Sequence, residues 1–109
     1  MSIKLKVNNE LFSSIGVEIQ QLSWRVNKES DIDILGGIVS STGNASIIPF
    51  RIMGNLCDSS GNVLYTVQDF GSHTLDPIRY EVFHVFCADI SRFIDMDTLS
   101  FVELFPARA

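Results

Sequence analysis

The chain has 109 residues and a net charge of −5 at pH 7, with 46% hydrophobic and 19% charged residues. This length is typical of one ordinary domain, so we predict a single domain over residues 1–109. The eight Lys and Arg residues are scattered along the chain. Nucleic acids and anionic membranes bind clustered positive charge, so the sequence argues against both as partners.

The sequence predicts a cytoplasmic protein. No window approaches about 18 consecutive apolar residues, which is the length of a membrane-spanning helix. The first residues alternate lysine with apolar residues and do not form the apolar core of an export leader. If the chain is cut from a longer exported protein, we expect it in the cell envelope.

The first two strands are predicted from alternation. Residues 3–7 alternate apolar side chains with Lys4 and Lys6, as expected for a strand with one buried face, and the lysines are typical of a sheet edge. A second strand follows over residues 15–26. Its apolar phase changes at Gln20 and Gln21. A slip of one residue turns every side chain to the other face, so we predict a β-bulge there.

The middle of the chain contains the clearest turn signal. A third strand is predicted over residues 32–38, where Gly36-Gly37 indicates a bulge or the close approach of another backbone. A fourth strand over residues 48–56 contains Pro49, which belongs at a sheet edge or at the start of a strand. The segment 58–62 then places a glycine where a type I turn with an αL bulge needs positive φ. We predict a hairpin there, followed by a return strand.

The last third of the chain is strongly apolar. Residues 80–87 have apolar side chains on both faces, which predicts a central strand. Asp89 is placed to act as the N-cap of a single helical turn. The final strand runs from Leu99 to Phe105 and is closed by Pro106. Its only charged residue is Glu103. As a bare edge it would invite pairing, so we expect it to be central or covered by a second chain.

Seven or eight short strands with one helical turn predict an all-β fold, an immunoglobulin-like antiparallel sandwich of two sheets. Cys57 and Cys87 are the only cysteines. In antibody domains the core tryptophan lies between the two bridged cysteines, whereas Trp24 precedes both here. We therefore predict two free thiols, with an intersheet disulfide as the alternative.

Three segments carry a family resemblance: residues 34–39, residues 56–64, and residues 75–77 followed by Phe83. In these segments the chain resembles the bacterial FxLYD-type domains and, more loosely, other bacterial immunoglobulin-like sandwiches. The positions of the family's Phe and Tyr hold Gly54 and Cys57. The resemblance implies a sandwich that is often attached to cell-envelope proteins, and it supplies no active site.

Two histidines are available as bases at neutral pH. His84 alternates with apolar residues and is interpreted as a structural residue. His73 lies in the loop 69–77 beside Ser72 and Thr74, so it is the better functional candidate. The usual hydrolase, phosphate-binding and metalloprotease motifs are absent.

Metal binding is not predicted. Asp58, Ser60 and Asn62 resemble the start of a calcium loop, but the twelfth position holds Asp69, where such loops need glutamate. The cysteines form no closely spaced pair suited to zinc. We therefore expect neither a metal nor a cofactor.

The leading hypothesis is a non-enzymatic module for protein–protein interaction or assembly. Its partner is another protein chain, with a second copy in a homo-oligomer as one option. Phe12, Phe70 and Phe105 flank loops or the terminus and are candidates for an apolar contact patch. The predicted binding residues are His73, Phe70 and Phe105.

Two alternative functions remain open at the level of sequence. A small-ligand-binding sandwich would be favoured by a cavity lined with Trp24 and phenylalanines. An enzyme using His73 would need a pocket that joins this histidine to a carboxylate and a hydroxyl.

Overall fold

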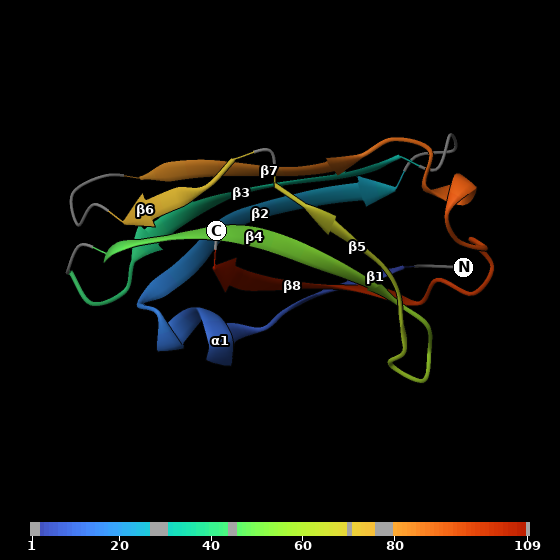
Figure 1. Ribbon diagram of the computed structural model, residues 1–109, viewed down its shortest axis with the longest axis horizontal. Coiled ribbons are helices and arrows are strands. Elements are labelled where there is room, and N and C mark those ends of the chain that lie inside the picture. Colours follow the sequence, from blue (N-terminus) through green and yellow to red (C-terminus); the bar gives the residue numbers. More distant parts are fainter. Residues whose placement is uncertain (1–2, 27–30, 44–45, 70, 76–79, 109) are drawn as a thin grey trace.

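The alternating segments build two sheets that pack face to face (Figure 1), in a computed structural model that describes residues 3–26, 31–43, 46–69, 71–75 and 80–108. The strands are β1 (Lys4–Val7), β2 (Val17–Val26), β3 (Ile32–Ser40), β4 (Ser46–Cys57), β5 (Val63–Gln68), β6 (His73–Leu75), β7 (Glu81–Cys87) and β8 (Phe101–Arg108). The helical elements are α1 (Asn9–Ser14) and the 3₁₀ turn η1 (Ile90–Arg92).

The predicted all-β, two-sheet sandwich is confirmed. One sheet has the order β1-β8-β4-β5, with β6 also paired to β4, and the other has the order β2-β3-β7. The molecule measures 42 × 24 × 22 Å along its principal axes. One pair departs from the antiparallel prediction, because β8 enters the sheet beside β1 and runs parallel to it.

The core lies between the sheets and is built mainly by alternate residues of β3, β4, β7 and β8, as pleated strands require. It contains large side chains with 0–1% of their surface exposed: Ile32, Ile34, Ile38, Ile52, Leu56, Phe83, Val85, Val102 and Leu104. None of the described helices is long and apolar enough to cross a membrane.

Helix α1 closes one side of the sandwich, where it contacts β2 and β8. The side chain of Asn8 caps it by accepting a hydrogen bond from the Leu11 N–H at 3.1 Å. Phe12 points from this helix into the core and is 1% exposed. The expectation that Phe12 contributes to a surface patch is therefore wrong.

The predicted bulge in the second strand is confirmed. The register of β2 against β3 shifts between Gln20 and Ser23, and Gln21 has a φ of +52°. The paired glycines of β3 do allow a close approach, but the neighbours are aromatic rings and not a backbone. A Cβ on Gly36 would lie 2.6 Å from the Phe83 ring, and one on Gly37 would lie 2.0 Å from the Tyr80 hydroxyl oxygen.

The hairpin at residues 58–62 is confirmed. The Asp58 N–H donates to the Asn62 carbonyl at 3.0 Å, and Gly61 has a φ of +86°. Pro49 lies within a register irregularity between Ser46 and Phe50, where β4 pairs with β6. The irregularity lets this central strand tolerate a residue that has no N–H to donate.

The predicted position of β7 needs correction, whereas β8 takes the central position that was one of its two expected places. β7 is not central but forms the edge of the three-stranded sheet. Both of its faces are apolar because one packs on the core while the other exposes Val82 at 64%. β8 is central, between β1 and β4, and it continues through Pro106, which lies opposite Ile52, to Arg108. Self-association through a bare β8 edge therefore loses its basis.

Asp89 occupies the N-cap position of η1, as predicted, and its carbonyl accepts a hydrogen bond from the Arg92 N–H at 3.1 Å. It adopts a left-handed conformation with a φ of +52°, and its side chain makes no capping bond. Its carboxylate instead accepts a hydrogen bond from the Ser91 hydroxyl at 2.8 Å.

Candidate functional site: the groove between β5 and β7

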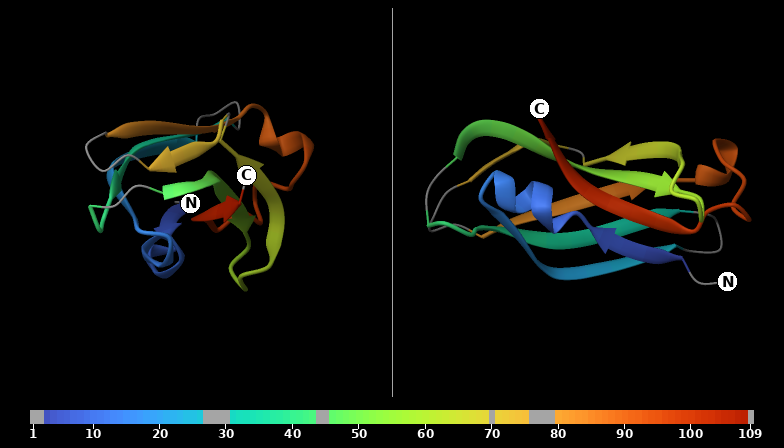
Figure 2. Two further views of the ribbon diagram at one scale, coloured as in Figure 1. Left: turned by 60° about the vertical axis from the view of Figure 1, so that its left-hand side comes forward. Right: turned by 90° about the horizontal axis from the view of Figure 1, so that it is seen from below.

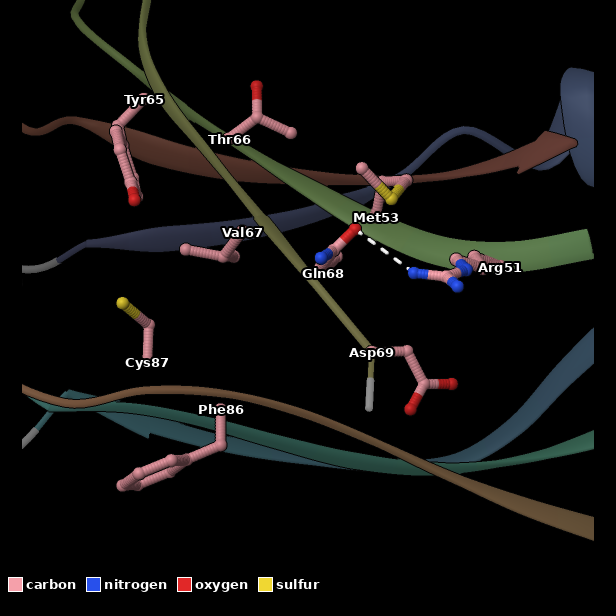
Figure 3. Close-up of a pocket in the computed structure, with 9 residues that line it drawn as sticks. All are labelled: Arg51, Met53, Tyr65, Thr66, Val67, Gln68, Asp69, Phe86 and Cys87. Atoms are coloured by element: carbon pink, nitrogen blue, oxygen red, sulfur yellow. Dashed lines mark hydrogen bonds between the residues drawn. The ribbon is translucent and has the colours of Figure 1, made fainter. Parts of the chain in front are cut away.

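The two sheets come together at β5 and β7, on the side of the sandwich opposite α1 (Figure 2). β5 and β7 each end their sheet, and a single antiparallel bridge between Asp69 and Val85 joins them. The described residues of β5 form no further pair with β7, and a groove of about 530 Å³ lies between the two strands (Figure 3). We call this feature the β5–β7 groove.

The lining of the groove shows that it follows the edge of a strand. Its residues are Arg51, Met53, Tyr65, Thr66, Val67, Gln68, Asp69, Phe86 and Cys87. Five of them are consecutive in the segment 65–69. Consecutive side chains of a strand point to opposite faces. A groove lined by all five therefore runs along the backbone edge of β5 and not over one of its faces.

The hydrogen-bond pattern of β5 determines which backbone groups face this groove. The Asp69 N–H donates to the Ile52 carbonyl at 2.9 Å, so at residue 69 the backbone groups point toward β4. Antiparallel ladders alternate this direction from one residue to the next, and the register with β4 is regular from Leu56 to Met53. The N–H and C=O of Thr66 therefore point away from β4 and toward the groove.

The groove is polar at one end and apolar at the other, as Figure 3 shows. At the polar end an Arg51 guanidinium nitrogen donates to the Gln68 side-chain oxygen at 3.4 Å. At the apolar end lie Tyr65 and Cys87. The Tyr65 ring stacks on Phe93 with 4.7 Å between the ring centroids and an interplanar angle of 6°.

Cys87 places a thiol at the groove, and the second thiol lies elsewhere in the fold. Both cysteines are free, as predicted, with Cys57 at the end of β4 and Cys87 at the end of β7. Burial raises the pKa of the Cys87 thiol, and the charge of Asp31 adds to this effect. Burial also raises the pKa of Cys57. At pH 7 both are therefore neutral thiols, which are poor nucleophiles.

His73 lies behind the groove and links three segments of the chain. Its side chain is 8% exposed, its Nε2 contacts the Asp69 carboxylate, and its Nδ1 lies 3.4 Å from Glu81 Oε1. The ring also lies against Phe50, with 5.8 Å between the ring centroids. The imidazole thus ties β6 to the end of β5 and to β7.

His84 has the partner expected of a structural histidine, although it lies on an outer face. Its Nε2 is 2.5 Å from a carboxylate oxygen of Asp33, and the other oxygen of that carboxylate is 3.4 Å from Arg25. The three residues belong to the three strands of the smaller sheet.

The structure does not bring the predicted binding residues together. His73 pairs with one edge of β4 through β6, whereas Phe105 lies opposite Met53 on the other edge. Phe105 is half-buried, and Phe70 lies outside the described residues. Of this set, none lines the groove within the described part of the chain. Sequence reasoning missed the groove residues because Thr66 and Gln68 look like the exposed face of any hairpin strand.

The calcium-like loop uses its carboxylate internally. Asp58 accepts hydrogen bonds from the backbone N–H groups of Ser60 at 3.0 Å and Asn62 at 2.9 Å, and from the Asn62 amide at 3.1 Å. The bonds from Asn62 do most to hold the pKa of Asp58 below its ordinary value of 3.8. Among the described residues, no group of three or more His, Cys, Asp or Glu side chains is arranged to hold a metal ion.

Comparisons with known proteins bear on the fold alone. No family model and no curated protein matches the chain. A solved structure, described as the crystal structure of Campylobacter jejuni cj0090, matches with a TM-score of 0.53 and 12% sequence identity, covering 99% of this chain and 100% of that one. This likeness supports the sandwich architecture. The resemblance to FxLYD-type domains stays a prediction.

Proposed function

We propose that this protein is a non-enzymatic interaction module that binds an extended segment of another protein chain as an added strand in the β5–β7 groove. The observation that carries the proposal is that the groove runs along the edge of β5. The backbone N–H and C=O of Thr66 point into this groove. Strand addition of this kind uses backbone hydrogen bonds for affinity and alternate side chains for specificity.

The other end of the larger sheet is protected against pairing. β1 forms that edge and exposes Lys4 and Lys6, and edge lysines discourage the addition of further strands. The neighbouring side of the sandwich is closed by α1 and Phe12. The groove side of β5 instead presents Thr66, which has no charge. Of these two edges, β5 is therefore the one suited to a partner.

The shape of the groove favours an extended segment over a folded second copy. Phe86 and Cys87 of β7 form its far wall. A folded sandwich brings a second layer wherever it adds a sheet edge, and that layer would collide with β7. A single extended chain needs only about 4.8 Å from the edge to which it pairs.

The two rival functions have less support. The volume falls within the range of small-molecule sites, but Trp24 does not line the groove and the lining follows a strand edge. For an enzyme, His73 would need a hydroxyl beside it. Its ring contacts in the described part of the chain are Asp69, Glu81 and Phe50, none of which has a nucleophilic hydroxyl.

A selection experiment tests the proposal. Dodecapeptides of random sequence are displayed and selected on the wild-type protein, and the selected peptides are then measured against Thr66→Pro and Thr66→Val. Proline at position 66 removes the N–H that faces the groove, and it leaves the hydrogen bonds between β5 and β4 in place. A proline in this position is tolerated in an edge strand. We expect Thr66→Pro to weaken binding at least about ten-fold, comparable to the loss of a strand-pairing contact. Thr66→Val should bind like the wild type.

A second measurement guards against loss of folding in the proline variant. Selected peptides are resynthesised with N-methyl groups at alternate residues, in both phases. One phase should abolish binding to the wild type and the other should leave it intact. Equal binding of the peptides to all three proteins, equal binding in both methylation phases, or failure to select any peptide would contradict the proposal.

A further inference from the structure

The side chains around the β5–β7 groove specify what kind of segment fits it, an inference that rests on the proposed function. A strand added beside β5 has side chains that alternate between the inner side and the outer face of the larger sheet. Its inward side chains meet a different set of residues from its outward ones.

The inner side of the groove is apolar. Val67 and Tyr65 point inward from β5, since they lie opposite the inward-facing Gly54 and Leu56 of β4. Cys87 contributes a neutral thiol from the opposite wall, and its pKa is raised by burial. Two inward side chains of an added segment, two residues apart, therefore meet apolar surface.

The outer side of the groove has an available positive charge. The hydrogen bond at 3.4 Å to the Gln68 amide is the interaction that the structure shows for Arg51, and none of the described carboxylates forms an ion pair with it. The nearby carboxylate of Asp69 is already bound to His73. An acidic side chain beside Gln68 would therefore meet a guanidinium that has no charged partner among the residues the structure describes.

We infer that the groove binds an extended segment in which two apolar residues alternate with polar ones and an acidic residue follows in the outward phase beside Arg51. Four such residues span about 13 Å at about 3.3 Å per residue. The preference for an acidic segment runs against the net charge of the protein, which is −5. It therefore depends on a local contact and not on the overall field.

Two synthetic dodecapeptides test this inference. One has the core Glu-Val-Thr-Val-Glu between Gly-Ser flanks, and the other has Lys-Val-Thr-Val-Lys. Both cores read the same in either direction, so the orientation of the added strand does not matter. Affinities are measured at 0.15 M salt for the wild type, Arg51→Glu and Lys4→Glu. Lys4→Glu changes the net charge equally but lies on β1, at the far edge of the sheet.

We expect the wild type to bind the glutamate peptide about two- to five-fold more tightly than the lysine peptide, as for an exposed ion pair. Arg51→Glu should reverse this preference, and Lys4→Glu should keep it, because charges beyond about 8 Å are largely screened. Equal binding of the two peptides, equal effects of the two charge reversals, or no binding of either peptide would overturn the inference. If the inference failed but Thr66→Pro still weakened the binding of the selected peptides, the proposed function would stand without the preference for an acidic segment.

Discussion

Gly61 shows how a single residue fixes a turn. It has a φ of +86° in the β4–β5 hairpin, and an added Cβ would meet no other atom within 4 Å. A side chain there is therefore opposed by the backbone conformation and not by a clash. The neighbouring Asp58 supports the same turn through its carboxylate.

Replacing Gly61 tests this reading of the turn. Gly61→Val should lower the free energy of unfolding by more than about 1 kcal/mol, because a β-branched residue is strained at positive φ. Ser59→Val, in the same exposed loop, should have a small effect. Urea denaturation of the two variants measures both losses. Equal and small losses would show that the turn does not depend on the glycine.

The contribution of Asp58 should depend on pH. Hydrogen bonds from Asn62 hold its pKa below 3.8 in the folded protein, so the unfolded chain takes up the proton first as the pH falls. The stabilisation from Asp58 is present above the pKa of the unfolded chain, and it is lost as the pH falls through the lower pKa of the folded protein. The difference in unfolding free energy between wild type and Asp58→Asn should therefore shrink on acidification below 3.8. A difference that stays constant with pH would contradict the assignment.

At the level of elements, local signals were predictable from the sequence and pairing partners were not. The bulge at Gln20-Gln21 and the hairpin at Gly61 follow from a phase slip and a turn residue, which are local. The positions of β7 and β8 within their sheets depend on neighbours distant in sequence, and alternation reports only which faces are buried. Helix α1 has six residues, too few for a periodic signal.

The candidate site was less predictable than the fold for the same reason. His73 was singled out for its chemistry, but its partner Glu81 comes from another strand and gives it a structural role. The groove arises where two edge strands from different sheets lie close together. That relation depends on the packing of the sheets, and the residues of β5 alone give no indication of it.

The contact between His73 and Asp69 should hold β6 to the rest of the sandwich. His73→Leu should lower the unfolding free energy by about 3 kcal/mol or more, because it leaves the buried Asp69 carboxylate without its partner. The double variant Asp69→Leu with His73→Leu should be more stable than the single one, since it removes the unpaired charge. Thermal unfolding of both single variants and of the double variant measures the coupling. If the two single losses in unfolding free energy add up to the loss of the double variant, His73 and Asp69 are not coupled.

At the scale of the whole molecule, the two sides of the sandwich differ. One side is closed by α1 and bordered by the lysines of β1. The other side has one bridge between the sheets, at Asp69 and Val85, and then opens into the β5–β7 groove. Under the proposed function, this asymmetry would direct a partner to one side of the protein.

The most direct test of strand addition is amide hydrogen exchange at Thr66 and Val67, followed by NMR in the free protein and with a selected peptide bound. Val67 should be protected in both states, because its N–H points toward β4. Thr66 should exchange rapidly in the free protein and become protected when the peptide binds. If Thr66 is already protected without peptide, or exchanges equally fast with peptide bound, β5 does not accept an added strand.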